Sequence, residues 1–340
     1  MNSVIKSILR VSFLFILIAI LCLAIFIIYL IIENPRNDSS DVNFGVTFSQ
    51  VFTEDMGLDW QKTYLSILDD LGVNKIRLIA YWPRIEPEQG KYSFKDLDWQ
   101  VDQAGKRGVE IILAMGRKVP RWPECHIPNW ANNLSEQDQQ EKILSMFTEI
   151  VNHYQGNDAI KILQIENEPF LKGFGICPKL DKDFLDKEIA LVRELDFDRR
   201  PIMVTASGEL SSWIKPAIRA DAFGTTLYRI VWNKRFGYLK YPLPPIFYQA
   251  RAKIVKWVTQ IDKMVIIELQ AEPWGPVLIY KAGAEENSKS MDLEKFKGII
   301  DYTYKTGFDE AYFWGVEWWY WLKEVEGDDS IWLEAKKLWD

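Results

Sequence analysis

Eight short apolar runs alternate with longer amphipathic segments between residues 44 and 315, and this rhythm restricts the possible folds more than any other feature. Such short runs are typical of buried strands. The segments between them carry apolar residues at helical spacing, as Tyr64, Ile67 and Leu71 do. The predicted strands are Phe44–Phe48, Lys75–Ala80, Val109–Met115, Ile160–Glu166, Pro201–Ala206, Ala222–Leu227, Met264–Leu269 and Glu310–Gly315.

Eight strand–helix units over roughly 300 residues match the size of a (β/α)8 barrel. Several helical segments end at a glycine just before the next strand, at Gly72, Gly108, Gly156 and Gly307. A doubly wound sheet is the competing α/β fold. It is disfavoured because Thr47-Phe48-Ser49-Gln50 stands where a glycine-rich phosphate loop would follow the first strand. We therefore predict one (β/α)8 TIM barrel domain over residues 44–340.

Residues 11–32 form an uncharged apolar stretch, which as a helix would span about 33 Å, enough for a bilayer core. A cleaved signal peptide is the alternative, but its apolar region is shorter and ends in small residues. Lys6 and Arg10 precede the stretch, so the positive-inside rule places residues 1–10 in the cytoplasm. The sequence thus predicts a single-pass transmembrane signal anchor at 11–32, a linker at 33–43, and a barrel that is extracellular or periplasmic.

The predicted membrane topology places the three cysteines in two different environments. Cys22 lies in the predicted membrane span, which leaves Cys125 and Cys177 as a pair in an oxidising compartment. A disulfide between them and two separate thiols both remain open, because the sequence does not give their separation.

The amino-acid composition limits the kinds of catalytic group to expect. The balance of 41 Lys+Arg against 48 Asp+Glu gives a net charge of −7, which argues against nucleic acid as a partner. The chain has 15 Trp but only 2 His, too few for most histidine-rich metal sites, so we predict no metal and no cofactor. Carboxylates are therefore the first candidates for catalysis.

The fourth predicted strand ends in Gln164-Ile165-Glu166-Asn167-Glu168-Pro169. Functional residues of a barrel lie at the C-terminal ends of its strands. A carboxylate at Glu168 would project over the mouth, and Asn167 could hydrogen-bond a substrate hydroxyl. A surface turn built from Asn, Glu and Pro is the alternative.

A second carboxylate closes the seventh predicted strand, in Ile266-Ile267-Glu268-Leu269. A glutamate in an apolar strand is costly unless it faces a functional site. Glu272, four residues later, is expected at the rim or in an ion pair. We expect strands four and seven on opposite sides of the ring, with Glu168 facing Glu268. Two opposed carboxylates are what the cleavage of a glycosidic bond requires.

Other residues near the predicted strand ends are candidate sugar contacts. Indole rings can stack on the apolar faces of sugars. His126 makes either a substrate contact or a local hydrogen bond, and Tyr228 either a site contact or a core contact. Arg77 interrupts a strand that should be buried, where an unpaired charge would cost several kcal/mol. The tryptophans in question are Trp82, Trp122, Trp274 and Trp314, and Glu166, Glu209 and Glu317 are lower-ranked candidates.

Together these residues resemble the retaining glycoside hydrolases of clan A, which include families five, ten and forty-two. The resemblance covers most of residues 44–323. It rests on Ile76-Arg77, Tyr81-Trp82-Pro83-Arg84-Ile85-Glu86-Pro87, Gly90-Lys91-Tyr92, Asp98, Pro120-Arg121-Trp122, Asn167-Glu168-Pro169 and Ile267-Glu268-Leu269.

The resemblance implies that Glu168 is the general acid/base and Glu268 the nucleophile of a retaining mechanism. It also implies that Asn167 binds the sugar 2-hydroxyl, that Arg77 and Tyr228 support the nucleophile, and that Trp314 forms the floor under the attacked sugar. The two carboxyl groups of a retaining pair are expected about 5–5.5 Å apart. Glu272 remains a rival nucleophile.

We therefore predict a membrane-anchored retaining glycoside hydrolase, with 44–340 as its catalytic domain. It would cleave a β-linked oligo- or polysaccharide by double displacement between two glutamates, with the lipid bilayer as a partner through residues 11–32. A carbohydrate-binding barrel without activity is the alternative, since fold does not fix function. A transglycosylase that uses the same pair also remains open.

Overall fold

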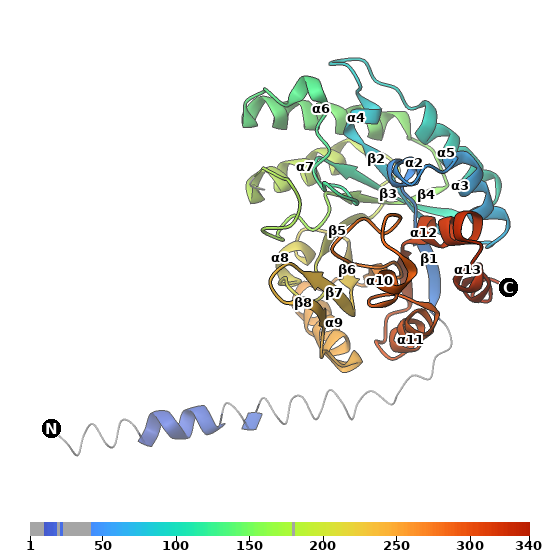
Figure 1. Cartoon of the computed structure of the whole chain (residues 1–340). Helices are drawn as coiled ribbons and strands as arrows, with labels where there is room; N and C mark the ends of the chain where they lie inside the picture. Colours follow the sequence, from blue (N-terminus) through green and yellow to red (C-terminus); the bar gives the residue numbers. More distant parts are fainter. Residues whose placement is uncertain (1–9, 19–20, 23–41, 179–180) are drawn as a thin grey trace.

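The computed structural model describes residues 10–18, 21–22, 42–178 and 181–340. Eight parallel strands close into a barrel, in the order β1-β10-β9-β6-β5-β4-β3-β2, and helices surround it (Figure 1). This confirms the predicted (β/α)8 barrel. The barrel strands are β1 (Asn43–Thr47), β2 (Lys75–Tyr81), β3 (Glu110–Gly116), β4 (Ile160–Ile165), β5 (Ile202–Ala206), β6 (Ala222–Leu227), β9 (Lys263–Gln270) and β10 (Glu310–Trp314).

The helices lie in the connections between strands and after β10. The α-helices are α2 (Gln50–Asp55), α3 (Trp60–Asp69), α4 (Trp82–Ile85), α5 (Lys95–Lys106), α6 (Glu136–His153), α7 (Lys182–Leu195), α8 (Ile214–Ala217), α9 (Pro245–Thr259), α10 (Ala284–Ser288), α11 (Leu293–Tyr304), α12 (Val316–Trp321) and α13 (Ser330–Lys336). A 3-10 turn, η1 (Asn129–Ala131), and a π-helical turn, η2 (Leu322–Glu326), complete the set.

Local sequence explains where several helices begin and end. Asp59 caps α3, because its side chain accepts hydrogen bonds from the backbone N–H groups of Gln61 and Lys62. Ser135 and Asp292 cap α6 and α11 in the same way. Each of the glycines predicted to end a helix, Gly72, Gly108, Gly156 and Gly307, has a φ of 70° to 73°, the left-handed conformation that ends helices.

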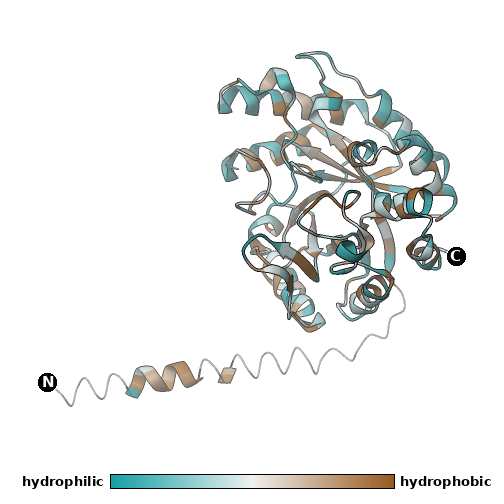
Figure 2. Cartoon of the chain, viewed as in Figure 1, coloured by the Kyte–Doolittle hydropathy of each residue, from teal (hydrophilic) through white to brown (hydrophobic). Residues whose placement is uncertain are grey.

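The core has two layers, which Figure 2 shows as brown strands within a partly teal shell of helices. Inside the barrel, side chains from neighbouring strands fill the lumen, so it is a packed core rather than a pore. A larger cluster lies between the strands and the helices. The lumen residues are Ile112, Ile162, Met203, Ala222, Val265, Ile267 and Tyr312.

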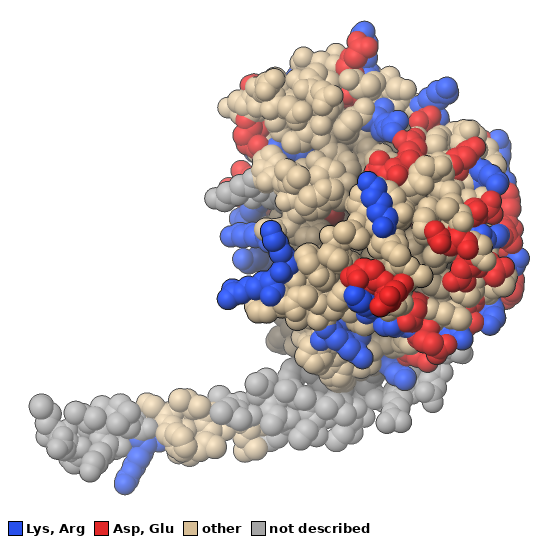
Figure 3. Space-filling view, viewed as in Figure 1, with Lys and Arg blue, Asp and Glu red and all other residues tan. Residues whose placement is uncertain are grey.

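On the face seen in Figure 3, Asp and Glu gather mainly over the right half with some Lys and Arg among them, and several Lys and Arg side chains project at the lower left edge.

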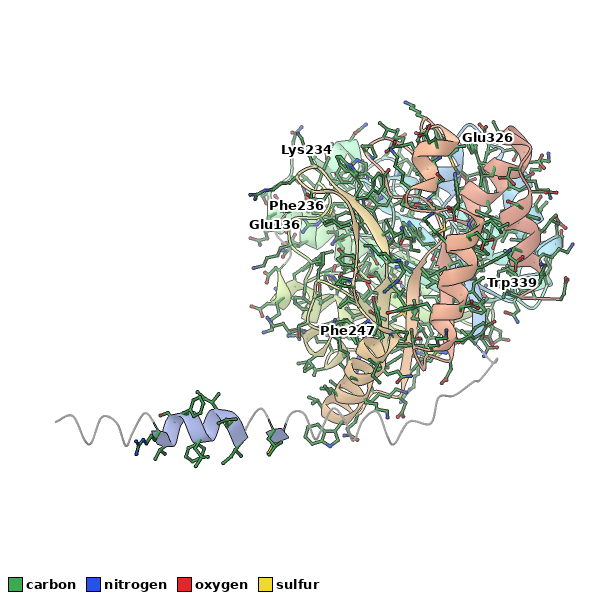
Figure 4. All side chains as sticks on the ribbon, turned by 60° about the horizontal axis from the view of Figure 1, so that its bottom comes forward. Glu136, Lys234, Phe236, Phe247, Glu326 and Trp339 are labelled. Carbon is green, nitrogen blue, oxygen red and sulfur yellow. A yellow bond between two sulfur atoms is a disulfide. The ribbon has the colours of Figure 1, made fainter. Side chains whose placement is uncertain are left out.

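A hairpin between β6 and α9 was not predicted. It pairs β7 (Ile230–Asn233) with β8 (Gly237–Lys240) in an antiparallel sheet separate from the barrel. Its strands are four residues long, too short for a clear alternation to stand out in the sequence. In Figure 4 the tip residues Lys234 and Phe236 lie at the edge of the molecule. Because the hairpin follows β6, it belongs to the mouth of the barrel.

The ring order corrects one expectation. Strands β4 and β9, the fourth and seventh of the barrel, are not opposite one another, because only β5 and β6 separate them on one side of the ring. Their C-terminal ends open on the same mouth, since all eight strands are parallel. The two glutamates therefore meet across about three strand positions rather than across the full diameter.

The described residues contain no helix that is both long and apolar enough to cross a membrane. Residues 10–18 and 21–22 are helical, whereas residues 19–20 and 23–32 of the predicted span lie outside the described part of the chain. Residues 1–9 and 33–41, which cover most of the predicted cytoplasmic segment and linker, also lie outside it. The anchor, the linker and the location of the barrel stay predictions.

The cysteine question is settled by the fold. Cys125 and Cys177 form a disulfide with their Cα atoms 5.2 Å apart. The bond joins the loop that follows β3 to the loop that follows β4. Both loops border the mouth of the barrel.

Candidate active site

A cavity of about 620 Å³ opens at the mouth of the barrel. Its walls come from the C-terminal ends of seven of the eight strands or from the loops that follow them. Carboxylates dominate its charged groups. The charged lining residues are Asp55, Arg121, Glu124, Glu168, Lys172, Glu209, Glu268 and Glu272.

An irregularity in β9 aims Glu268 at this cavity. The register of β9 shifts against both neighbours, since Thr225 pairs with Ile266 while Thr226 pairs with Glu268, and the pairing with β10 also shifts there. A bulge of this kind breaks the alternation of side chains between the two faces of a strand. Ile267 and Glu268 can therefore both face inward, Ile267 in the lumen and Glu268 at the cavity.

Both oxygens of Glu268 are held by hydrogen bonds. Arg77 Nη1 donates to Oε1 at 3.0 Å, and the Tyr228 hydroxyl donates to Oε2 at 3.1 Å. These are the two residues expected to support the nucleophile. The bonds fix the orientation of the carboxylate, and the guanidinium balances its charge.

Arg77 crosses the barrel from β2 and connects the two halves of the site. Its side chain is fully buried, and it also donates to Gln164 Oε1 and to Asn167 Oδ1, each at 2.8 Å. An arginine in a buried strand is thus explained by three partners at the mouth. We call Arg77, Gln164, Asn167 and Glu268 the polar floor.

The turn after β4 places Asn167 and Glu168. The Asn167 N–H donates to the Lys118 carbonyl at 2.6 Å, and the Glu168 N–H donates to Thr205 Oγ1 at 2.8 Å. Lys118 Nζ donates to the Glu168 carbonyl at 3.1 Å. Glu168 has a φ of 45°, a strained conformation for a residue with a side chain, and strain of this kind clusters at functional sites.

The environment of Glu168 suits an acid. Burial, and after it repulsion from Glu268, raises the pKa of its carboxyl well above the ordinary value. Its Oε1 is buried and has no hydrogen-bond partner among the described residues. Glu168 lines the cavity, where a protonated carboxyl can donate to a substrate.

Glu272 is held in an ion pair. Its Oε1 accepts hydrogen bonds from Arg121 Nη1 at 2.6 Å and from the Trp314 indole at 2.8 Å. Arg121 also donates to Glu317 Oε2 at 2.7 Å. Gly315 permits this packing, because a Cβ there would lie 2.5 Å from the Glu272 Cβ. The ion pair agrees with the rim role expected for Glu272.

Three predicted tryptophans line the cavity. Trp314 is buried beneath the Arg121 guanidinium, which lies 4.1 Å from its ring centre. Trp274 packs edge-on against Tyr228, with ring centres 5.2 Å apart. Trp122 is 62% exposed and stands at the rim.

Trp82 and His126, two of the predicted substrate contacts, do not line the cavity, and each has a local hydrogen bond. Trp82 is fully buried at the start of α4, where its indole donates to Glu86 Oε2 at 2.8 Å. His126 is buried beside Tyr81, and its Nε2 lies 3.0 Å from the Arg121 carbonyl oxygen, which is the local hydrogen bond of the alternative reading. Burial lowers the pKa of the His126 imidazole.

Of the three lower-ranked glutamates, one lines the cavity and two lie behind it. Glu209 lines the cavity and accepts hydrogen bonds from the Tyr248 hydroxyl at 2.6 Å and the Tyr228 N–H at 2.8 Å. Glu317 is fully buried behind Arg121. Glu166 lies behind the site, where it accepts two backbone N–H groups of the loop after β3.

Glu124 is a site residue that the sequence reading missed. It is 5% exposed, lines the cavity, and its Oε2 lies 3.5 Å from Asn167 Nδ2. Burial, followed by repulsion from Glu268, raises its pKa to about 8. Its only signal in the sequence is a charge between Pro123 and Cys125, in a loop that the disulfide brings to the mouth.

Within the described ranges, no three His, Cys, Asp or Glu side chains come together as a possible metal site. The charged groups of the cavity are instead arranged as carboxylates, two of which are held by buried arginines.

A parallel eight-stranded barrel with acidic side chains at the ends of its fourth and seventh strands defines a glycoside hydrolase barrel of clan A. The chain belongs to glycosyl hydrolase family 5, because residues 39–242 match the model of the cellulase family.

A curated relative is β-galactosidase BbgII of Bifidobacterium bifidum. It is 27% identical over 122 residues, which cover 31% of this chain and 18% of the relative. The chain thus spans less than a fifth of the length of that relative.

Solved structures share the fold. A xylanase from Thermotoga maritima matches with a TM-score of 0.57 at 13% identity, covering 87% of this chain and 95% of the xylanase. An exo-β-1,4-mannosidase from an Opitutaceae bacterium matches with a TM-score of 0.54 at 15% identity, covering 81% of this chain and 52% of the mannosidase. Such identities establish the barrel and leave the substrate open.

Proposed function

We propose that this protein is a retaining glycosidase that cleaves a β-linked sugar from its leaving group. The carrying observation is the contrast between the two glutamates of one cavity: Glu168 has a raised pKa and an unpartnered oxygen, while Glu268 is held by Arg77 and Tyr228. A general acid must keep its proton and a nucleophile must be held in place, so these two environments assign the acid role to Glu168 and the nucleophile role to Glu268.

The two residues act in two steps. Glu168 gives its proton to the glycosidic oxygen while the Glu268 carboxylate forms a bond to the anomeric carbon, so the leaving group departs as an alcohol. Glu168, now ionised, then takes a proton from a water molecule that attacks the same carbon and releases Glu268. Asn167 is buried behind the cavity lining, and among the described residues its Nδ2 has one hydrogen-bond contact, at 3.5 Å to the lining residue Glu124. We propose that this amide donates to a sugar hydroxyl when substrate is bound.

The β-linkage is supported by the relatives, whose names describe a β-galactosidase and an exo-β-1,4-mannosidase. Aromatic rings at Trp314, Trp274 and Trp122 offer faces on which sugars can stack. We infer a β-linked oligo- or polysaccharide, or another β-glycoside, as the substrate.

Removal of either carboxylate tests the assignment. We expect Glu168→Gln and Glu268→Gln each to lower kcat by at least about 10³-fold on a panel of nitrophenyl β-glycosides. Glu110→Gln, at the opposite end of the barrel, is the matched control and should keep full activity. Substantial hydrolysis by either site variant would contradict the proposal.

Product stereochemistry and labelling test the mechanism separately. NMR taken immediately after cleavage should show the β-anomer first, because two displacements retain configuration. A 2-fluoro sugar should label Glu268, and a label on Glu272 would transfer the nucleophile role to that residue.

We also propose that residues 11–32 anchor the protein in a membrane with the barrel outside the cytoplasm, on the strength of the uncharged stretch and its flanking charges. The full chain should sediment with membranes and resist carbonate extraction. A full-length protein that stays in the supernatant would overturn the anchor without affecting the catalytic assignment.

A further inference from the structure

Large apolar side chains gather at the rim of the catalytic cavity although they are exposed to solvent. Each belongs to the lining, and each is between 37% and 68% exposed. Exposed apolar groups that gather in one concave place mark a binding surface rather than ordinary scatter. The residues are Trp122, Leu210, Leu239, Val277 and Leu278, which we call the apolar wall.

The apolar wall is built from four separate segments. It combines the loops after β3, β5 and β9 with strand β8 of the hairpin. The β9–α10 loop, which contains the run Val277-Leu278-Ile279, includes a brown stretch in Figure 2. Four segments distant in the sequence thus present aliphatic or aromatic side chains to one cavity.

The apolar wall lines the same cavity as the reacting groups Glu168 and Glu268. In that lining, Val231 of β7 packs in one cluster with Tyr228 and Trp314, and Trp274 packs against that cluster. The Tyr228 hydroxyl in turn hydrogen-bonds Glu268. A molecule whose sugar lies between Glu168 and Glu268 can therefore extend directly onto the apolar wall.

The chemistry of the apolar wall suits an alkyl chain better than a second sugar. Sugar hydroxyls that lose water need polar partners, and leucine and valine side chains provide none. An alkyl chain gains free energy from the same contact in proportion to the area it buries. The cavity volume of about 620 Å³ is in the range of sites for small molecules rather than of protein interfaces.

We propose that the apolar wall binds the aglycone of an amphipathic β-glycoside, an alkyl chain joined through the glycosidic oxygen to the sugar that reacts at Glu168 and Glu268. This inference rests on the proposed glycosidase function and narrows its substrate. In the first step the proton of Glu168 goes to the oxygen that links sugar and chain, and the chain leaves as an alcohol while the sugar becomes bonded to Glu268. Water then completes the hydrolysis.

The test compares β-glucosides and β-galactosides that carry methyl, butyl or octyl groups, below the concentrations at which they form micelles. A methylene group that is half covered should raise kcat/KM about twofold. The kcat/KM of the octyl glycoside should therefore exceed that of the methyl glycoside by on the order of 10²-fold.

Two outcomes would contradict the proposal at different levels. If the wild-type enzyme hydrolyses nitrophenyl β-glycosides but its kcat/KM does not depend on chain length, the apolar aglycone site alone is overturned. Hydrolysis of no β-glycoside overturns the glycosidase function as well.

Variants assign the effect to the apolar wall. Val277→Ser with Leu278→Ser, and separately Leu210→Ser, should each lower the octyl-to-methyl ratio of kcat/KM by about threefold or more. Leu333→Ser on α13 is the matched control, because Leu333 is 51% exposed but does not line the cavity, and it should leave the ratio unchanged. A ratio that stays at the wild-type value in both wall variants would overturn the proposal.

Discussion

The polar floor reaches the cavity through Glu268, the apolar wall lines the same cavity, and the two regions differ in burial and in hydrogen bonding. Every charged or amide group of the floor is buried and bonded across the barrel, whereas the wall leaves large apolar side chains in water. The floor is part of the fold, since its groups have partners only when the barrel closes. The exposed side chains of the apolar wall bury little area in the free protein and so add little to its stability. Contact with a bound molecule accounts for their presence.

The largest effect should come from the floor. Arg77→Met leaves the Glu268 carboxylate buried without its cation, and we expect the free energy of unfolding in urea to fall by about 3–5 kcal/mol. Lys106→Met, which removes an exposed partner of Asp102, should leave the urea midpoint unchanged. Equal stability of the Arg77 and Lys106 variants would remove the distinction between floor and surface.

The disulfide next to the site should have a somewhat smaller effect. Cys125 and Cys177 are 52 residues apart, and replacing both with Ser restores the freedom of that loop in the unfolded chain. We expect a loss of about 2–4 kcal/mol in the free energy of unfolding, measured by thermal and urea denaturation. Reductant should destabilise the wild type to a similar extent and leave the double variant unaffected.

The charge of Glu124, next to the polar floor, can be removed without a change in side-chain shape. The Glu124 carboxyl adjoins Asn167 and faces Glu268, Glu168, Lys118 and Arg77. When Glu124 is ionised, above about pH 8, its negative charge raises the pKa of Glu168. In Glu124→Gln that repulsion is absent, so Glu168 loses its proton more readily and the alkaline limb of kcat/KM should move to lower pH. Each pH unit of displacement lowers the rate within the limb by about tenfold.

The same carboxyl also links stability to pH. Its folded pKa of about 8 is above the ordinary value, so the folded state binds the proton more tightly between pH 4.5 and 8, and stability falls as pH rises through that window. Glu124→Gln should flatten this decline in pH-dependent melting. The Glu110→Gln control should keep both the wild-type limb and the wild-type decline.

The smallest effect on stability should come from the apolar wall. Leu210 is 68% exposed, so Leu210→Ser should change the free energy of unfolding by less than about 0.5 kcal/mol. The melting temperature should therefore match that of the wild type even though chain-length selectivity falls. A large loss of stability in this variant would make the apolar wall a structural element rather than a binding surface.

Much of the fold was available from local patterns. Eight apolar runs at strand length, separated by amphipathic segments that end in glycine, were enough for the barrel, because strand and helix periodicity are properties of neighbouring residues. Glu168 and Glu268 were visible for the same reason, since each interrupts an apolar strand or ends it.

The finer placement of side chains was not available. Trp82 and Trp122 look alike as tryptophans after strand ends, yet one is buried against Glu86 and the other is exposed at the cavity rim. Glu124 carries no signal of its own, because only the folded loops bring it beside Asn167. The strands β7 and β8 of the hairpin are too short for a clear alternation of apolar and polar residues in the sequence.

By itself, therefore, the sequence determined the barrel, its two principal carboxylates and the arginine that needed a buried partner. The tertiary structure decided which groups meet. Arg77 and Glu268 are 191 residues apart along the chain, and the β9 bulge that turns Glu268 inward appears only in its pairing with β6 and β10. Strand and helix periodicity depends on neighbouring residues, so it can be read from the sequence. The site depends on contacts between residues that are distant in the sequence, so only the tertiary structure shows it.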